Sequence, residues 1–526
     1  MGIRDNLQYT FLLSYGQNNM IKFKNSILEN INIQINAPLF YISSNFEIYN
    51  STIRNCNTNY SYLMLLSSII RKDTQINIDQ LNFIDSSALI TGSEVQINIK
   101  NSIFHNIINK VPNPIIINML NSDIRFTDVT FRNITSLRSS FFAEKAQYQF
   151  SNVLFEDIAT NSKTLIDTFY SDISFFNSQF KNILLNGDVD NSSLINFNSN
   201  GNTLNMENVI LNNIKANGNL IVIEGYLPNI KINNTEISDT SSFGSLLTNI
   251  SSNSNIHIIN SNILNNVNLN KIKQGLITSY TSVNIIAQNS KFSNNIVKNN
   301  GGVFCFLNNT QSDIKIFSSL FENNNSMYGG AIYISNTKNK HSNTTLEIID
   351  SSFVENKVQY LGGGIYIDDQ YLKFFNISNS KFIKNSSYAG GALYLNNYDY
   401  VSTSNNKDIK EYIYNFKQNN NVFINNTSES HGNDYGSQPY LIYLKDSNDK
   451  LQKVEMKSGN FFYISKLLFI IVDVFDQIIV DRSKYYSNII LKIAVIDNNI
   501  LNNTKSIQSN TIKLIGNECN FYQEAD

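Results

Sequence analysis

The sequence predicts an all-β chain, a right-handed parallel β-helix of about fifteen coils that is followed by a small antiparallel β-sandwich-like domain. Three observations support this fold class. A unit of strand, turn and strand recurs along most of the chain, apolar and polar residues alternate within its strands, and Asn or Asp follows its central apolar residue. Period-two alternation indicates strands that each bury one face, and strands this short need neighbouring units stacked on them.

The unit is clearest in Leu346–Ile367, whose sequence is LEIIDSSFVENKVQYLGGGIYI. Phe353 is its anchor, with apolar residues five and seven positions earlier and Asn356 three positions later. The same frame fits along the chain at a spacing of roughly 21–32 residues, which is typical of solenoids, except that the last interval is about 41 residues. The anchors are Leu28, Ile53, Phe83, Phe104, Phe131, Phe155, Phe180, Leu211, Ile237, Ile263, Phe292, Phe321, Phe353, Phe382 and Phe423.

Stacked coils would place equivalent side chains in ladders along the rod. We expect the anchors to form a buried column and the Asn residues to form a turn ladder, in which each amide bonds to the coils on either side. A buried amide without a partner costs about 1–3 kcal/mol, and the repetition itself supplies the partner. On this hypothesis the sequon residues Asn133 and Asn385 are buried. The residues that represent these two structural ladders are Phe104, Phe131, Phe321, Phe353, Phe382, Asn106, Asn133, Asn356 and Asn385.

A leucine-rich repeat is the alternative architecture at this period. It needs Leu at most framework positions and a helical return, whereas the framework here is Ile and Phe and the return is a second alternating strand. In four late units a Gly pair precedes that second strand. Glycine there permits a positive φ or a close approach between coils. The pairs are Gly301-Gly302, Gly329-Gly330, Gly362-Gly363 and Gly390-Gly391.

The frame divides the chain into a repeat domain, residues 1–436, and a C-terminal domain, residues 437–526. Residues 1–20 are expected to be irregular, and an insertion over about Asn396–Asn421 is expected to project as a loop or short helix. After Gln438-Pro439 the frame stops and longer strands follow, as in a small sandwich. These strands are expected at Tyr440–Leu444, Phe461–Ile464, Leu467–Val474, Ile489–Val495 and Ile512–Ile515.

Composition excludes several classes of function. A formal net charge of −2 gives no bias toward nucleic acid. The most apolar segment, Phe461–Val480, carries Lys466, Asp473 and Asp476, so we expect no insertion into a membrane by this segment. Three cysteines far apart match neither a zinc site nor a CxxC motif. We therefore predict a monomer without metal or cofactor.

An enzyme on this fold would place carboxylates, or a carboxylate and a basic residue, on adjacent coils of one outer face. Asp157 of the pair Glu156-Asp157 falls at a turn-ladder position, so that pair is read as structural. Asp368-Asp369 is the better candidate, but two acids at a strand end are more often a solvated turn. The four histidines lack a metal-binding spacing and sit in separate coils or loops: His105, His257, His341 and His431. His257 is expected to face solvent, because it falls between the inward Ile256 and Ile258. We predict no catalytic residues.

Tyrosines recur at one outward-facing position of the second strand in three late units. Because Ile332, Ile365 and Leu393 should point inward, the residues that follow them, Tyr333, Tyr366 and Tyr394, should point outward. This surface stripe could bind carbohydrate or a protein partner. We favour the simpler interpretation that stacked aromatic rings stabilise parallel strands.

The paired motifs F-x-x-N and G-G-A-I resemble the repeats of the polymorphic outer-membrane proteins of chlamydiae, and related β-helix repeats of large protist surface proteins. They read Phe321-Glu322-Asn323-Asn324 with Gly329–Ile332, and they recur from Phe353 and Phe382. Only residues 290–395, roughly, match both halves. The resemblance implies a pectin-lyase-like fold, a cell-surface or extracellular glycoprotein, and a chain that is a fragment or ectodomain of a larger membrane protein. It implies no catalytic residues.

The sequence thus favours a non-enzymatic, surface-displayed or secreted β-helix that acts in adhesion or as a structural scaffold. Its expected partner is a cell-surface carbohydrate or protein. The competing hypothesis is a carbohydrate-active β-helix enzyme, either a polysaccharide lyase or a glycoside hydrolase.

Overall fold

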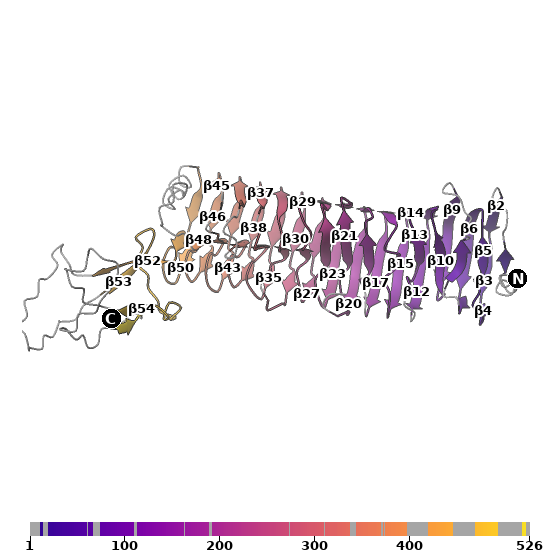
Figure 1. Cartoon of the computed structure of the whole chain (residues 1–526), viewed down its shortest axis with the longest axis horizontal. Helices are drawn as coiled ribbons and strands as arrows, with labels where there is room; N and C mark the ends of the chain where they lie inside the picture. The colour runs from indigo at the N-terminus through magenta and orange to yellow at the C-terminus, as the bar shows by residue number, and fades with distance from the viewer. Residues whose placement is uncertain are drawn as a thin grey trace, which may run out of the picture.

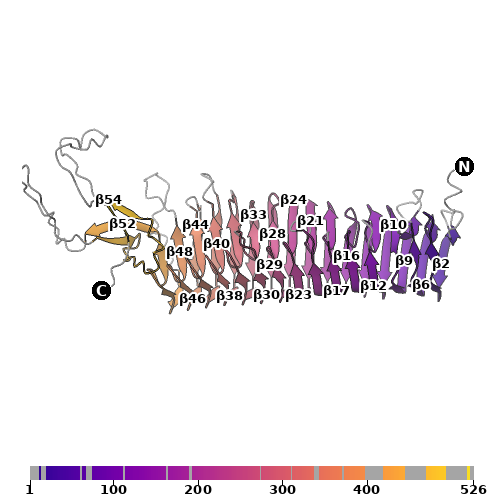
Figure 2. The same cartoon turned by 90° about the horizontal axis from the view of Figure 1, so that it is seen from below.

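The chain folds into a long parallel β-solenoid with short antiparallel pairs at its C-terminal end (Figures 1 and 2). The computed structural model describes residues 11–13, 19–59, 62–66, 74–109, 113–161, 164–188, 192–272, 274–309, 311–336, 343–369, 372, 374–396, 419–444, 469–492 and 518–521. Over these residues all the regular structure is β. The predicted fold class is therefore confirmed.

One coil has three faces, which we call A, B and C. In the coil around Phe353, face A is β41 (Thr345–Ile349), face B is β42 (Ser352–Val354) with β43 (Lys357–Val358), and face C is β44 (Ile365–Asp368). Each strand pairs in parallel with its equivalents in the neighbouring coils. A strand of one coil is thus completed only by the next coil, as the short alternating segments require.

Faces A and B belong to one continuous sheet, in which β6 (Asn45–Arg54) and β9 (Gln75–Ile84) run through both faces. The remaining strands of face A are β2 Met20–Lys24, β11 Gln96–Lys100, β14 Asp123–Thr127, β16 Gln147–Ser151, β19 Ile173–Phe176, β22 Thr203–Glu207, β25 Asn229–Asn233, β29 Ser254–Ile259, β33 Val283–Gln288, β37 Asp313–Phe317 and β45 Phe374–Ser378. Those of face B are β3 Ile27–Glu29, β12 Ile103–Asn109, β15 Thr130–Ser136, β17 Leu154–Thr160, β20 Gln179–Leu185, β23 Ile210–Ala216, β26 Glu236–Ser238, β27 Ser241–Ser242, β30 Asn262–Leu264, β31 Val267–Asn268, β34 Lys291–Ser293, β35 Ile296–Val297, β38 Leu320–Glu322, β39 Asn325–Ser326, β46 Lys381–Ile383, β47 Ser386–Ser387, β49 Val422–Ile424 and β50 Thr427–Ser428. In the first coils, β4 Asn32–Ile33 and β7 Asn57–Thr58 pair with each other in a separate two-stranded sheet.

Face C consists of two parallel sheets in succession. The first contains β1 Leu12–Leu13, β5 Phe40–Ile42, β8 Tyr62–Leu66, β10 Ala88–Ser93 and β13 Ile117–Leu120. The second contains β18 Ile166–Phe169, β21 Ile195–Asn200, β24 Ile221–Tyr226, β28 Leu247–Asn249, β32 Ile277–Ser279, β36 Phe304–Leu307, β40 Ile332–Ser335, β44, β48 Leu393–Asn396 and β51 Tyr435–Ser437. Because β1 pairs with β5, the solenoid begins inside the stretch 1–20 that was expected to be irregular.

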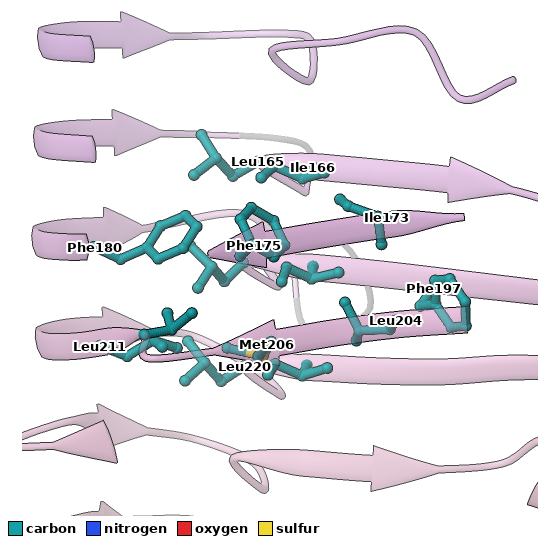
Figure 3. Close-up of a cluster of buried hydrophobic side chains, with 14 of the residues drawn as sticks. Leu165, Ile166, Ile173, Phe175, Phe180, Phe197, Leu204, Met206, Leu211 and Leu220 are labelled. Atoms are coloured by element: carbon teal, nitrogen blue, oxygen red, sulfur yellow. The ribbon is translucent and has the colours of Figure 1, made fainter. Parts of the chain in front are cut away.

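The core is a set of columns parallel to the rod. Every predicted anchor pairs with the next one, from Leu28 with Ile53 to Phe382 with Phe423. The rings of Phe353 and Phe382 stack with centroids 4.8 Å apart and planes 4° apart. Figure 3 shows an aromatic-to-aliphatic step, where Phe180 lies above Leu211 and Phe175 above Met206.

Two asparagine columns, not one, follow the anchors. Asn106 and Asn133, two residues after their anchors, have φ of 57° and 50° and lie exposed, with Asn133 Nδ2 donating to Asn106 Oδ1 at 2.8 Å. Asn356 and Asn385, three residues after theirs, are 0% exposed. The expectation that Asn133 is buried is therefore wrong. The residue two positions after each of these anchors has a left-handed φ, so its own side chain points to solvent and the next one points inward.

The Gly pairs satisfy two separate requirements. The first residue of each pair has a positive φ, for example 82° at Gly301 and 55° at Gly329. The second lies directly against the next coil: a Cβ on Gly302 would be 1.7 Å from the carbonyl oxygen of Gly330. Only glycine fits at this second position, because a methyl group would overlap a main-chain atom that cannot move aside.

Beyond Ser437 the parallel pattern ends. β52 (Pro439–Leu444) pairs antiparallel with β53 (Phe469–Asp473), and β54 (Ile490–Lys492) pairs antiparallel with β55 (Glu518–Asn520). The expected strands at 461–464 and 512–515 and most of the insertion, residues 397–418, lie outside the described residues. The sandwich-like arrangement of residues 437–526 therefore stays a prediction.

Candidate functional site

The predicted tyrosines form a column on the outer side of face C. Tyr333, Tyr366 and Tyr394 occupy equivalent positions of β40, β44 and β48, and Cys305 of β36 precedes them. Adjacent rings are nearly parallel, with centroids 5.0 Å apart for Tyr333–Tyr366 and 5.9 Å for Tyr366–Tyr394. The neighbouring Ile332, Ile365 and Leu393 are in the solenoid core, so the alternation directs the tyrosines outward.

The column is nevertheless not exposed. Tyr333, Tyr366 and Tyr394 are 3%, 6% and 1% exposed, and they belong to a second apolar cluster that is separate from the solenoid core. This cluster includes Ile471, Ile479 and Tyr486 from the C-terminal region. The prediction of a surface stripe is therefore wrong, because the C-terminal segment 469–492 covers these rings.

Hydrogen bonds join the C-terminal segment to the column and its flanking tyrosines. Tyr394 and Tyr486 share a bond between their hydroxyl oxygens at 3.2 Å, and Tyr328 and Tyr485 do the same at 3.2 Å. Sequence reasoning missed Tyr485-Tyr486. The only available signal was an aromatic pair in a non-repetitive segment, and nothing in the period indicates what that pair contacts.

Asp481 organises this attachment. It is 1% exposed, its Oδ1 accepts from the backbone N–H of Tyr485 at 2.8 Å and its Oδ2 from that of Tyr486 at 2.8 Å. The hydroxyl of Tyr388, on the solenoid, also donates to Asp481 Oδ1. One carboxylate therefore shapes the turn that carries both tyrosines and binds it to the last coils.

Burial changes the acid–base behaviour of these tyrosines. It raises the pKa of Tyr333, Tyr366 and Tyr394 above the usual value. Burial, with a contribution from Asp481, raises the pKa of Tyr388 to about 12. Removing a phenolate from water is unfavourable, so these hydroxyls stay protonated at neutral pH and can both donate and accept hydrogen bonds.

A pocket of about 580 Å³ lies between face C and the C-terminal region. Its aromatic lining comes from both sides and its polar lining consists of amides and one carboxyl group. The lining residues are Asn300, Tyr328, Tyr333, Leu361, Tyr366, Asp368, Tyr394, Asn396, Gln438, Pro439, Tyr485, Tyr486 and Ile489. We call this the tyrosine pocket.

Asp368 and Asp369 are not a solvated turn. They are 8% and 0% exposed, and Asn336 Nδ2 donates to Asp369 Oδ2 at 2.6 Å. Asp369 lies on the solenoid side, whereas Asp368 lines the tyrosine pocket. The expectation that both are exposed is wrong, because neighbouring coils and the C-terminal region enclose the end of β44.

The histidines lie in different surroundings. His257 is half-buried on the outer side of face A, and His105 bonds to Asn82 Oδ1 at 3.0 Å. His341 lies outside the described residues. His431 is 4% exposed, and its Nε2 lies 2.8 Å from the carbonyl oxygen of Ser437. Burial lowers the pKa of His431, and burial raises that of nearby Asp473.

Sequence reasoning also missed a polar cluster on face A. Lys231 and His257 are direct partners in adjacent coils, and Glu207 lies one coil earlier. They line a depression of about 620 Å³ together with Ser174, Thr203 and Asn205. The sequence does indicate that these side chains lie in one row, since Asn205, Lys231 and His257 each stand six residues before an anchor.

Among the residues that the structure describes, no group of three or more His, Cys, Asp or Glu side chains is arranged to hold a metal ion. Nor does that part of the chain contain a helix with the length and apolarity needed to span a membrane.

Comparison with known proteins adds little to the geometry. Neither a protein-family model nor a curated protein sequence matches the chain. Among solved structures, the crystal structure of Dettilon tailspike protein is similar over 67% of this chain, with 10% sequence identity and a TM-score of 0.24. The match covers 62% of the tailspike chain, which is less than two thirds of its length.

Proposed function

We propose that the chain is a non-enzymatic rod of the cell surface or extracellular space, which acts in adhesion or as a structural scaffold. The observation that supports this most directly is the unbroken column of anchors from Leu28 to Phe423, together with the strand pairing along all three faces. Such stacking resists bending and sets outward side chains at a regular spacing of roughly 4.8 Å. The resemblance to polymorphic outer-membrane protein repeats supports the location.

The test is adhesion by beads that carry the full chain. Beads should bind to intact cells under flow more strongly than albumin-coated beads. Treating the cells beforehand with periodate or with trypsin would show whether the partner is a carbohydrate or a protein. Binding no greater than that of albumin would contradict an adhesive role and leave only the scaffold.

The competing function is a carbohydrate-active enzyme, and Glu207, Lys231 and His257 are the observation that favours it. A carboxylate and basic groups on adjacent coils of one outer face are what such chemistry needs. The chain should be incubated with a panel of neutral and acidic polysaccharides, with new reducing ends and unsaturated products measured. Cleavage that is lost in Glu207→Gln and in His257→Ala would overturn the non-enzymatic proposal. Cleavage that is lost only in Asp368→Asn would do the same and would place the chemistry in the tyrosine pocket.

A further inference from the structure

The tyrosine pocket has the location and size of a ligand site. It lies between two parts of the chain that are far apart in sequence, the late coils and the region from Gln438 to Ile489. Such junctions are common positions for small-molecule sites, and about 580 Å³ falls within their usual range of roughly 300–1,000 Å³.

The aromatic lining presents ring edges and hydroxyl groups, since the faces of Tyr333, Tyr366 and Tyr394 lie against one another in the column. Tyr328 is half-buried and inclined by 66° to Tyr333 and by 67° to Tyr366, so its ring crosses the edges of the stacked column. Tyr366 lines the pocket, and its hydroxyl forms no hydrogen bond with any described residue. Tyrosine rings with hydroxyl groups beside them can contact a ligand that has one apolar side and polar edges.

The polar lining restricts the charge of the ligand. Asn300, Asn396 and Gln438 contribute amides, Asp368 contributes a carboxyl group, and the described lining contains no Lys, Arg or His. The tyrosine hydroxyls stay protonated because burial raises their pKa. An anionic ligand would find no positive charge here, whereas a neutral polyol would find both donors and acceptors.

We infer that the tyrosine pocket binds a neutral carbohydrate, with a pyranose C–H face against the tyrosine rings and its hydroxyls bonded to the amides, Asp368 and the Tyr366 hydroxyl. This inference rests on the proposed adhesive function and names the chemical class of its partner. It also gives the C-terminal region a role, since Tyr485 and Tyr486 complete the pocket that the coils alone leave open.

The test uses the full chain on an array of immobilised neutral, sulfated, sialylated and uronic-acid glycans, followed by titration of the strongest binder in solution. We expect binding to neutral glycans. Tyr366→Phe should weaken it about three- to tenfold, because one neutral hydrogen bond is removed while the stacked ring stays. Asn300→Phe should abolish it by filling the pocket. Tyr41→Phe, at an outward position of β5 far from the pocket, is the matched control and should bind like the wild type.

Three outcomes would overturn the inference: no neutral glycan retained by the wild-type chain, binding to acidic glycans alone, or equal binding by the wild type and both pocket variants. Thermal melting of each variant checks that it is folded. If beads that carry the pocket variants adhere to cells as well as beads that carry the wild-type chain, this inference is wrong and the adhesive function still stands. If the pocket binds glycans but the beads do not adhere to cells, the glycan site stands and the adhesive function is wrong.

Discussion

Asn356 donates a hydrogen bond of 3.0 Å from its side-chain Nδ2 to Oδ1 of Asn385, the equivalent residue of the next coil. The same Nδ2 donates to the carbonyl oxygen of Phe321 at 2.9 Å, and Asn356 Oδ1 accepts from Asn324 Nδ2 at 2.9 Å. Asn266, Asn295 and Asn426 extend this pattern. A buried amide chain thus runs through the late coils with each member satisfied by its neighbours.

Asn356→Ala should therefore destabilise the late coils by about 1–3 kcal/mol, because buried donors and acceptors of the adjacent asparagines lose their partner. Stability in a solenoid depends mostly on nearest neighbours, so amide hydrogen exchange should quicken around residues 321–395 and stay unchanged near Phe104. Asn205→Ala is the control, since this half-buried side chain on face A forms no hydrogen bond with the described residues. Its effect should be within about 0.5 kcal/mol. Equal exchange in the two variants would contradict a structural amide column.

Phe353→Ala should cost more, about 3–5 kcal/mol, because it leaves a cavity in the anchor column. The Phe353 ring is 0% exposed and stacks between Phe321 at 5.0 Å and Phe382 at 4.8 Å. Urea denaturation followed by circular dichroism would measure the loss. Phe374→Ala is the matched control, since Phe374 is 47% exposed on face A. A similar loss in both variants would mean that the anchor column does not determine stability.

The periodic part of this molecule could be predicted because one coil repeats the environment of the next. Phe353 recurs at the same place in the frame, so its pairing with Phe321 and Phe382 followed from spacing alone. The frame did not separate the two asparagine columns. Asn133 and Asn385 differ by only one residue in their distance from the anchor, and the left-handed φ at the nearer of these two positions decides which of them is buried.

The covered tyrosine face could not be predicted in the same way. Alternation correctly directs Tyr366 away from the solenoid core, but burial depends on Tyr485 and Tyr486, which belong to no repeat. Asp368 illustrates the same limit. It lies in a pocket because Tyr485 and Tyr486, more than a hundred positions later in the sequence, form the opposite wall. Long-range contacts that occur once leave no period in the sequence.

Gly302→Ala should destabilise the late coils by at least about 3 kcal/mol, which exceeds the usual cost of overpacking, because the new Cβ would lie 1.7 Å from the carbonyl oxygen of Gly330. Gly201→Ala separates this clash from backbone strain. Gly201 has a φ of 83°, and a Cβ at this position would have no atom within 4 Å, so the cost there should be only about 1–2 kcal/mol. Chemical denaturation of both variants tests the difference, and a Gly302 variant as stable as the Gly201 variant would argue against close contact between coils.

Acidification should loosen the junction between the last coil and the C-terminal strands. Burial lowers the folded-state pKa of His431 below its unfolded value of about 6.5. The unfolded state therefore binds more protons just below that value, and the His431 contribution to stability is lost as pH falls through it toward the folded pKa. Asp473 acts oppositely, because its raised pKa adds stability that is lost as pH rises from about 3.8 through the folded pKa.

Hydrogen exchange of residues 469–492 should accordingly quicken between about pH 7.5 and about pH 5.5, after correction for intrinsic exchange rates. His431→Gln retains an amide donor for the Ser437 carbonyl but cannot be protonated, so it should remove this dependence. The same pH response in the variant would assign the effect to another group.

Asp481 provides the sharpest test of how the C-terminal segment is held. Its carboxylate accepts from the backbone of Tyr485 and Tyr486 and from the hydroxyl of Tyr388 on the solenoid. Asp481→Ala leaves each donor without its acceptor, at about 1–3 kcal/mol for each one that stays buried. Most of the segment packs on the outside of face C and adds only Val474, at the C-terminal end, to the buried solenoid core, so the earlier coils do not depend on it. We therefore expect local release of residues 469–492, with faster proteolysis and exchange there, while the anchor column stays protected.

Arg482→Ala changes the adjacent, exposed residue and should leave the segment attached. If both variants resisted protease equally, the tyrosine contacts alone would hold the segment, and Tyr394 would stay covered without the carboxylate.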